Sequence, residues 1–373
     1  DGNNMEEVVN ALRRLRDIKG PRILHCLTLK GKGYPAAEKD PTTWHAPGRF
    51  NPETAERHTE GHVHDRYQDI FGEVLCDLAR RDRRVIGITP AMAHGCGMSR
   101  LASEQPDRFF DVGIEEEHAV TFAAGLAAAG MKPFCNIYSS FVQRAYDEVI
   151  HDVALQELPV VLCLDRAGLV GEDGATHQGA YDIAAFRCIP NVIISCPRNE
   201  TELKNLMYSA LESPKGPYII RYPRGMGEGA DWRDAEYELV PTGSAETLAE
   251  GSEIAIIATG PAVNRALEAA SGYPGKVGVY NFRFVKPLDE ELLSHIASKY
   301  GSIITVEDGS LKGGLYGAVC EFMMASGAAV RVEGIGIGDM FVEQARQKDQ
   351  QEAFGISRRG IEKKIEKVFE EQK

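Results

Sequence analysis

The chain has 373 residues, of which 43% are hydrophobic and 26% are charged, and its formal net charge is −13. This length is enough for two or three domains, and the composition is ordinary for a soluble globular protein. The negative charge argues against a general nucleic-acid or membrane-surface binder, but it is compatible with a local basic pocket for a small anion. No run of 18 or more apolar residues occurs in the sequence, so we expect no transmembrane helix.

The eight cysteines are scattered, form no C-x-x-C pair, and in several cases lie in apolar stretches typical of strands. Reduced, buried thiols in a cytosolic protein fit this distribution better than a disulfide framework does. The nearest approach to a metal-binding pattern is His58, His62 and His64. These histidines lie in a polar, acidic stretch that we interpret as a solvated linker.

Residues 1–62 contain one predicted helix and one predicted strand. Residues 5–18 carry apolar side chains at helical spacing, and residues 22–28 are predicted to form a buried strand. Residues 35–61 are rich in proline, charge and histidine, as is typical of a long connection. The chain opens on a turn sequence without a methionine, so we expect it to have been cut from something longer.

Residues 63–228 alternate between helical periodicity and short apolar runs. Continuous apolar strands that alternate with helices indicate a parallel sheet covered on both faces. Ligands of such sheets bind beyond the carboxyl ends of the strands. The predicted helices are 67–80, 118–129, 141–154 and 200–212, and the predicted strands are 84–89, 134–139, 159–165, 192–196 and 218–222.

A second α/β unit is predicted in residues 229–373, after a boundary rich in glycine and charge. Its predicted strands are 253–258, 276–281, 302–307 and 329–334, and its predicted helices are 262–270, 289–299, 313–325 and 360–373. The expected fold class is therefore α/β, with tandem three-layer domains that each contain a doubly wound parallel sheet.

Three consecutive glutamates, Glu115, Glu116 and Glu117, precede the helix predicted at 118–129. Successive helical residues point about 100° apart, so at most one of the three can face squarely into a cleft. A carboxylate at the start of a buried helix is well placed for proton chemistry, because its surroundings tune its pKa. Acidic residues also favour helix N-termini through the helix dipole, and the local pattern alone favours that simpler interpretation.

Polar side chains gather where the strands of residues 63–228 end. Tyr138 lies near the end of one strand, and Arg144 lies one turn into the helix behind it. Arg166 and Arg224 follow two further strands, and a glycine-rich segment adds His177. A single arginine usually belongs to a surface ion pair, but together these side chains at one sheet edge predict a phosphate or carboxylate pocket.

Two motifs are the most distinctive, GIEEEHA at 113–119 and DGATHQG at 173–179. With the segments around them, they resemble the thiamine-diphosphate enzymes of the transketolase superfamily, and within it the 1-deoxy-D-xylulose-5-phosphate synthase family. The resemblance spans essentially the whole chain. The matching segments are 30–34, 37–41, 44–46, 113–125, 138–147, 151–156, 164–171, 173–179, 221–225 and 281–289.

The resemblance implies a transferase that condenses pyruvate with glyceraldehyde 3-phosphate, with decarboxylation, to 1-deoxy-D-xylulose 5-phosphate. This is the entry step of non-mevalonate isoprenoid biosynthesis and also serves thiamine and pyridoxal biosynthesis. The implied cofactors are thiamine diphosphate and Mg²⁺, and a cytoplasmic homodimer is expected. The implied domains are the tail of a diphosphate-binding domain with its linker (1–62), a pyrimidine-binding domain (63–228) and a transketolase C-terminal-like domain (229–373).

By this resemblance, Glu116 hydrogen-bonds the aminopyrimidine ring of thiamine diphosphate and acts as a catalytic residue. Phe141 packs against the pyrimidine, although a plain core aromatic is the alternative, and Tyr34 lies near the cofactor. His177 is the expected proton-transfer and orienting group.

The implied substrate-binding residues surround the phosphate of the aldehyde. Tyr138, Arg166 and Arg224 are expected to hold that phosphate, with Arg144 nearby. Asp173 is expected beside His177 in the loop, with an ordinary polar turn as the alternative interpretation.

One departure from the family pattern concerns the diphosphate end of the cofactor. The superfamily holds its magnesium and diphosphate with a Gly-Asp-Gly motif and a downstream asparagine, and this sequence has neither in that arrangement. We therefore expect a C-terminal fragment or one half of a split enzyme, with the diphosphate-binding segment and the magnesium ligands upstream. Open alternatives are a split transketolase, the β-subunit of a 2-oxo-acid dehydrogenase, and a noncatalytic module.

Overall fold

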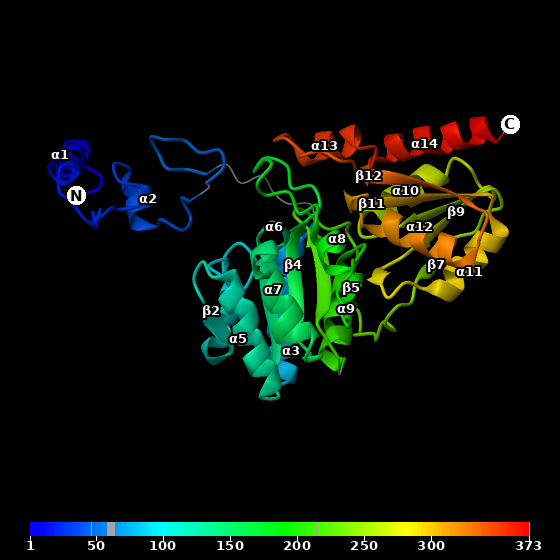
Figure 1. Cartoon of the computed structure of the whole chain (residues 1–373), viewed down its shortest axis with the longest axis horizontal. Coiled ribbons are helices and arrows are strands. Elements are labelled where there is room, and N and C mark those ends of the chain that lie inside the picture. The colour runs from blue at the N-terminus through cyan, green and yellow to red at the C-terminus, as the bar shows by residue number, and fades with distance from the viewer. Residues whose placement is uncertain (46, 58–63, 214, 373) are drawn as a thin grey trace. The chain divides into compact units, whose positions relative to one another are not determined.

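The computed structural model describes residues 1–45, 47–57, 64–213 and 215–372 (Figure 1). The chain divides into two compact units, Asp1–His62 and Val63–Lys373. The predicted linker histidines His58 and His62 lie outside the described residues. Among the residues that are described, no helix is long and apolar enough to cross a membrane.

The first unit contains two helices, α1 (Met5–Arg16) and α2 (Pro35–Lys39). The Asn4 side chain caps α1 by accepting hydrogen bonds from the backbone of the first turn. The strand predicted at 22–28 is wrong, because these residues are exposed and form no strand. An apolar run becomes a strand only where a neighbouring strand pairs with it, and here the backbone pairing is limited to Gly2 N–H donating to Leu27 O at 2.7 Å.

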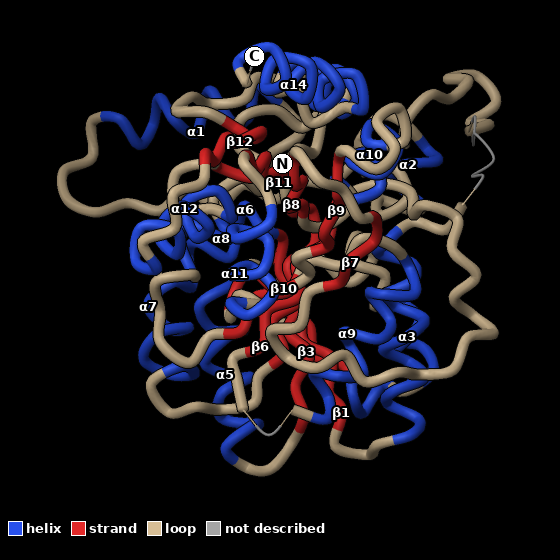
Figure 2. The backbone as a smooth tube through the Cα atoms, turned by 90° about the vertical axis from the view of Figure 1, so that its right-hand side faces the viewer, coloured by secondary structure: helices blue, strands red, loops and turns tan. Residues whose placement is uncertain are grey.

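A seven-stranded sheet organises the first part of the second unit (Figures 1 and 2). Its strand order is β10-β5-β6-β4-β3-β1-β2, and all neighbours are parallel except the pair β10 and β5. The strands are β1 (Val85–Thr89), β2 (Phe109–Asp111), β3 (Lys132–Tyr138), β4 (Val161–Ala167), β5 (Ile193–Ser195), β6 (Tyr218–Pro223) and β10 (Phe284–Lys286). The associated helices are α3 (Tyr67–Arg81), α4 (Ser99–Glu104), η1 (Pro106–Arg108), α5 (Glu116–Ala128), α8 (Asp182–Phe186) and α9 (Glu200–Glu212).

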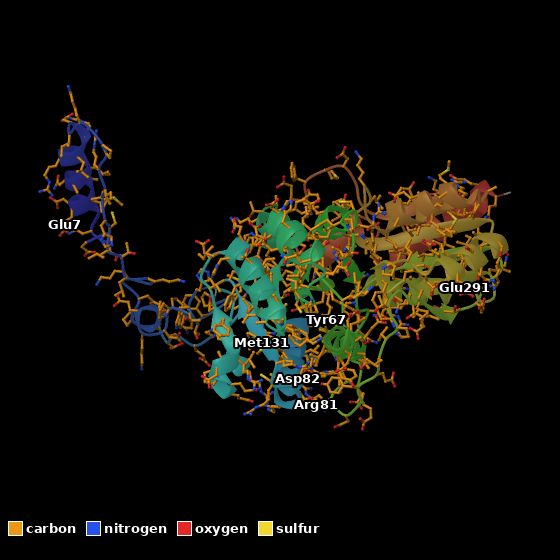
Figure 3. All side chains as sticks on the ribbon, turned by 60° about the horizontal axis from the view of Figure 1, so that its bottom comes forward. Glu7, Tyr67, Arg81, Asp82, Met131 and Glu291 are labelled. Carbon is orange, nitrogen blue, oxygen red and sulfur yellow. The ribbon has the colours of Figure 1, made fainter. Side chains whose placement is uncertain are left out.

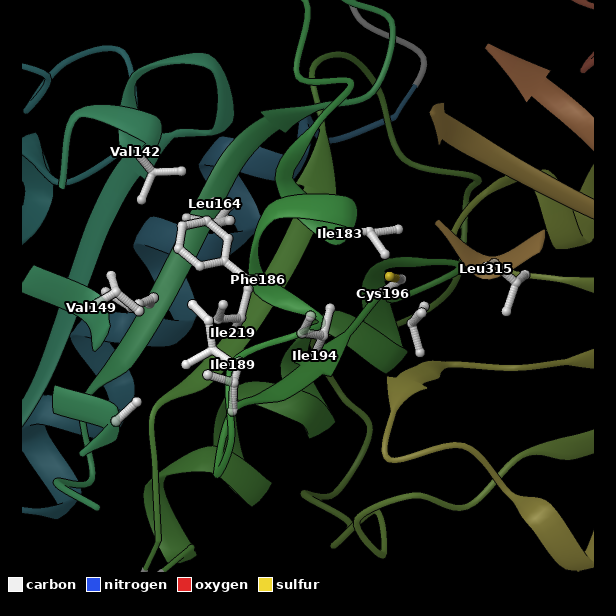
Figure 4. Packing of buried hydrophobic residues seen from close by; sticks show 14 of the residues in the cluster. Val142, Val149, Leu164, Ile183, Phe186, Ile189, Ile194, Cys196, Ile219 and Leu315 are labelled. Carbon is white, nitrogen blue, oxygen red and sulfur yellow. The ribbon is translucent and has the colours of Figure 1, made fainter. Parts of the chain in front are cut away.

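Both faces of this sheet are buried, which explains why its strands are continuous apolar runs. Along β4, Leu162 and Leu164 belong to the core cluster that includes the buried residues of α5. Val161 and Cys163 point the other way and pack with α3 and α9. Figure 4 shows residues of the first cluster, among them Phe186 and Leu164. In Figure 3, Tyr67 of α3 lies among other side chains, and it is fully buried.

The prediction of one continuous helix at 141–154 is wrong. The segment is divided into α6 (Ser139–Val142), the 3₁₀ turn η2 (Gln143–Ala145), α7 (Tyr146–Glu148) and the π-turn η3 (Val149–Ala154). Periodicity alone does not distinguish a regular helix from one whose turns tighten and widen, and such irregular turns often accompany functional sites.

The second sheet has five strands in the order β12-β11-β8-β9-β7, all parallel except β7. These strands are β7 (Glu246–Ala249), β8 (Ile254–Ala258), β9 (Val277–Asn281), β11 (Ser302–Ser310) and β12 (Arg331–Ile337). Its helices are α10 (Ala262–Ala270), α11 (Glu290–Lys299), α12 (Leu315–Ser326), α13 (Gln347–Ala353) and α14 (Arg358–Glu371). The predicted fold class, two α/β parts with largely parallel sheets, is confirmed.

The two sheets are joined by a strand that the sequence pattern did not predict. β10 follows β9 of the second sheet in the chain but pairs with β5 of the first, with Phe284 opposite Ser195. The largest core cluster also contains residues from both parts, including Cys196 and Leu315 (Figure 4). One hydrophobic cluster is therefore shared by the two sheets.

Candidate functional site

Glu116 is the first residue of α5, and the turn before it fixes its position. The Asp111 carboxylate accepts hydrogen bonds from the backbone of Ala91 at 2.8 Å and of Gly113 at 3.0 Å. Gly113 has a φ of 80°, which a side chain would disfavour. This turn starts the helix so that Glu116 is buried, whereas Glu115 and Glu117 are exposed. As expected from helical geometry, one of the three glutamates faces inward.

Among the described residues, the Glu116 carboxylate has one cationic partner, Arg144, at a long distance. Nη1 of Arg144 lies 3.5 Å from both Glu116 oxygens, at the limit of a hydrogen bond. The Glu116 side chain is 4% exposed and that of Arg144 is 55% exposed. A buried carboxylate normally accepts close hydrogen bonds. The Glu116 carboxylate can therefore accept a further hydrogen bond from a bound molecule.

Phe141 connects Glu116 to the predicted anion pocket. The Arg144 guanidinium lies 5.6 Å from the centre of the half-buried Phe141 ring. That ring stacks on Tyr138 at 5.7 Å and meets the His177 ring edge-on at 5.3 Å. The His177 Nδ1 lies 2.9 Å from the Thr176 hydroxyl. Side chains from α5, α6, η2 and the glycine-rich loop thus form one contact cluster.

Arg166 stands at the end of β4 in a strained backbone conformation. Its φ is 59°, which is uncommon for a residue with a side chain, and the register of β4 against β6 shifts at this point. The turn aims its guanidinium at the Tyr138 ring, 4.0 Å from the ring centre. Nη1 of Arg166 donates to the Asp165 carboxylate at 2.7 Å and to Gly95 O at 2.9 Å.

Burial perturbs the acid–base groups around Arg166. Burial raises the pKa of Asp165 to about 6, although the Arg166 guanidinium opposes this rise. Burial likewise raises the pKa of the Tyr138 hydroxyl, and Arg166 and Arg224 both partly oppose that rise.

Arg224 follows β6, whose Pro223 pairs with Ala167 of β4, so Arg166 and Arg224 flank neighbouring strand ends. Nη1 of Arg224 donates to Asp173 at 3.0 Å, to Glu172 at 3.2 Å and to Val170 O at 2.9 Å. Within the described residues, neither arginine uses Nε or Nη2 in a hydrogen bond. Both side chains therefore keep donors for an anion.

Tyr34 belongs to the first unit and has a separate environment. Its ring packs against Trp44 at 5.0 Å and Phe50 at 5.8 Å, and its hydroxyl is buried without a hydrogen-bond partner among the described residues. The structure brings the other eight predicted site residues into the arrangement described above, in which Asp173 contacts Arg224 and not His177.

Three residues of the second part contact the loop at the site, and sequence reasoning missed them. Asp308, Gln347 and Gln350 hydrogen-bond the backbone between Leu169 and Gly171. They follow that loop in the sequence by more than 130 residues, so no local pattern indicates the contact. Among the residues that the structure describes, no cluster of three or more His, Cys, Asp or Glu side chains could hold a metal ion.

Two family models match the chain. A transketolase pyrimidine-binding domain covers residues 66–228, and a transketolase C-terminal domain covers residues 243–361. Among solved structures, a split-gene transketolase described as an inactive β4 tetramer is similar, with a TM-score of 0.72 and 28% identity over 81% of this chain and 97% of that chain. A transketolase from Pichia stipitis solved with sedoheptulose 7-phosphate shares the fold, with a TM-score of 0.65 and 22% identity over 85% of this chain and 48% of that one.

Curated relatives are similar over almost the whole chain. The 1-deoxy-D-xylulose-5-phosphate synthases of Parabacteroides distasonis and Bacteroides thetaiotaomicron are 48% and 49% identical over 98% and 99% of this chain. That of Nitrosospira multiformis is 45% identical over 97%. The chain spans 58–59% of the length of these relatives. The predicted recognition is confirmed: the chain belongs to the transketolase superfamily, and within it resembles the 1-deoxy-D-xylulose-5-phosphate synthases over nearly its whole length.

Proposed function

We propose that this chain supplies the pyrimidine-binding and C-terminal parts of an enzyme that condenses pyruvate with glyceraldehyde 3-phosphate, with decarboxylation, to 1-deoxy-D-xylulose 5-phosphate. The similarity to synthases along 98% of the chain supports this reaction. The chain spans about 58% of those relatives, and a diphosphate-binding part would complete the enzyme. The product would enter isoprenoid, thiamine and pyridoxal biosynthesis.

The buried Glu116 carboxylate is the observation that carries this proposal. Its oxygens have no donor closer than 3.5 Å among the described residues. The donor at that distance, Arg144, also contacts the half-buried Phe141 ring. A buried carboxylate that accepts only long hydrogen bonds from the described residues, together with a flat apolar ring, suits a nitrogen heterocycle with donors on its edge. These residues therefore fit the pyrimidine end of thiamine diphosphate.

Thiamine diphosphate, when bound, supplies the carbon nucleophile and accepts the electrons released by decarboxylation. Glu116 would hold and orient the aminopyrimidine by a hydrogen bond and keep its proton mobile. Phe141 would pack on the ring face, and His177, in contact with Phe141 at 5.3 Å, would exchange a proton with the substrate. Tyr34 would lie near the cofactor, as the family resemblance implies. We propose that Mg²⁺ and its ligands belong to the diphosphate-binding part.

The aldehyde phosphate would lie between the arginines. Arg166 and Arg224 keep guanidinium nitrogens without partners among the described residues, and both are half-buried, where a phosphate gains most from a bidentate contact. Tyr138 lies against Arg166, and Asp173 orients Arg224. Arg144 adds positive charge over the Phe141 ring. We further propose a cytoplasmic homodimer, in which the eight free cysteines stay reduced.

A second candidate function is that of a split transketolase subunit. The similarity to a split-gene transketolase chain over 97% of its length favours it. That protein is described as inactive as a β4 tetramer, so a chain of this extent would need a partner chain. The two candidates differ in donor substrate, because the synthase reaction requires pyruvate and a transketolase transfers a two-carbon unit between sugar phosphates.

The test combines the purified chain with a diphosphate-binding domain from a related synthase, in the presence of thiamine diphosphate and Mg²⁺. We expect 1-deoxy-D-xylulose 5-phosphate from pyruvate and glyceraldehyde 3-phosphate, little product from the chain alone, and no ketol transfer from xylulose 5-phosphate. Ketol transfer without use of pyruvate would support the second candidate. Full activity of the chain alone would contradict the need for a diphosphate-binding part.

A further inference from the structure

The loop that carries Asp173 and His177 is a closed structure of residues 168–179. Its ends pair through two backbone hydrogen bonds between Gly168 and Gly179, at 2.7 and 2.8 Å. Inside it, the Gln178 side chain accepts from Val170 N–H at 2.8 Å. Most of its remaining backbone hydrogen bonds between 168 and 171 are made to residues of the C-terminal part, which supports the loop from outside.

Asp308 of β11 is the first support. Its buried carboxylate accepts the backbone N–H of Leu169 at 2.9 Å. A Cβ at Gly168 would lie 2.4 Å from the carboxylate carbon of Asp308, so glycine is required for this approach. The backbone carbonyl of Asp308 in turn accepts from the buried Arg221 of β6 at 2.9 Å, which ties the support to the first sheet.

Gln347 and Gln350 of α13 are the second support, and they lie one helical turn apart. The buried Gln350 accepts from Gly171 N–H at 3.0 Å and donates to Gly171 O at 3.4 Å, and it also donates to Glu343 O at 2.9 Å. Gln347 donates to Leu169 O at 2.7 Å and to Arg224 O at 3.2 Å. One amide group therefore contacts both the loop and the residue that follows β6.

We propose that Gln347 and Gln350, together with Asp308, are positioning residues by which the C-terminal part holds the 168–179 loop against Arg224 and sets the affinity of the site for the phosphate-bearing aldehyde. This inference rests on the proposed function for its substrate but not for its geometry. The loop contacts Arg224 twice, through Val170 O at 2.9 Å and Asp173 at 3.0 Å, so a displaced loop misplaces the guanidinium. None of the three positioning residues touches Glu116, so the proton chemistry at Glu116 does not depend on them directly.

The geometric half is tested by amide hydrogen exchange in the chain itself. Gln350→Leu keeps the volume but removes the polar contacts, and Gln347→Leu is a second variant at a half-buried site. We expect exchange in peptides covering residues 168–172 to rise about tenfold in both variants, because one or two hydrogen bonds are lost. Gln351→Leu, the same change on the same helix, is the matched control and leaves the loop at the wild-type rate.

The functional half is tested by steady-state kinetics of the complete enzyme. We expect Gln350→Leu to raise the KM for glyceraldehyde 3-phosphate about tenfold, with kcat and the KM for pyruvate changed less than about twofold. A purely structural role would lower kcat or raise both KM values together, and that pattern would overturn the proposal. Unchanged loop exchange in both variants, or faster exchange over the whole chain in both, would also overturn it. A wild-type complete enzyme that does not make the product would refute the proposed function, and the exchange experiment would still decide the geometry.

Discussion

Glu307 should make the stability of this protein depend on pH. The side chain is fully buried on β11 and accepts the backbone N–H groups of Leu315 at 2.9 Å and Tyr316 at 2.8 Å, at the start of α12. Burial raises the pKa of Glu307 from 4.5 to about 7, although these two hydrogen bonds oppose the rise. Because the folded-state pKa is the higher one, Glu307 stabilises the fold below pH 4.5 and loses that contribution as the pH rises through 7.

The size of the effect follows from the two pKa values. Between pH 5 and pH 8, the unfolded chain releases the Glu307 proton more completely than the folded chain, which lowers the free energy of unfolding by about 2 kcal/mol. Glu307→Gln removes this contribution. It also leaves one of the two N–H groups at the start of α12 without an acceptor, which costs about 1 kcal/mol at every pH. The variant should therefore be less stable at pH 5 and have a flatter pH profile.

Urea unfolding of the wild type and Glu307→Gln at pH 5 and pH 8, followed by circular dichroism, measures this difference. Glu291→Gln, at an exposed position of α11 marked in Figure 3, is the control for loss of a surface charge. If Glu307→Gln had the same loss of unfolding free energy from pH 5 to pH 8 as the wild type, the assignment of this dependence to Glu307 would be wrong.

Three further changes test other parts of the account. Arg224→Ala should raise the KM for glyceraldehyde 3-phosphate by about 10- to 100-fold in the complete enzyme and leave the KM for pyruvate nearly unchanged, and equal effects on both would argue against a phosphate contact. In the structure, Arg221 Nε lies 2.8 Å from the buried Asp182 carboxylate. Arg221→Met leaves that carboxylate without its cation and should lower the free energy of unfolding by about 3–5 kcal/mol in a urea titration. Gly168→Ala should lower the melting temperature, because a Cβ would meet Asp308 at 2.4 Å and φ is +76°, and a melting temperature equal to that of the wild type would refute this packing.

Much of the fold was predictable because both sheets are covered on each face. Buried parallel strands have to be apolar at every position, so strands such as β8 and β9 stand out from the helices around them. Helix limits were clear where Asn199 caps the first turn of α9, but the predicted helix 360–373 began two residues after the start of α14, which Ser357 caps.

The errors share a physical cause, which is dependence on partners distant in the sequence. The run at 22–28 has the composition of a strand but has no neighbouring strand to pair with among the described residues of its unit. The short strand β10 forms only because β5 offers an open edge. In the same way, the polar motifs around Arg166 and Arg224 predicted an anion pocket, but no local pattern indicated that Gln350 supports the adjoining loop.

The rate at which the C2 hydrogen of bound thiamine diphosphate exchanges with D₂O tests the central claim, that Glu116 is the acid–base residue of the cofactor site. In the complete enzyme, Glu116→Gln should slow this exchange at least about 100-fold, because the amide cannot take up and return a proton. Glu117→Gln, the same change at the adjacent exposed glutamate, should leave the rate unchanged. Exchange at the wild-type rate in Glu116→Gln, or equal slowing in both variants, would contradict the account.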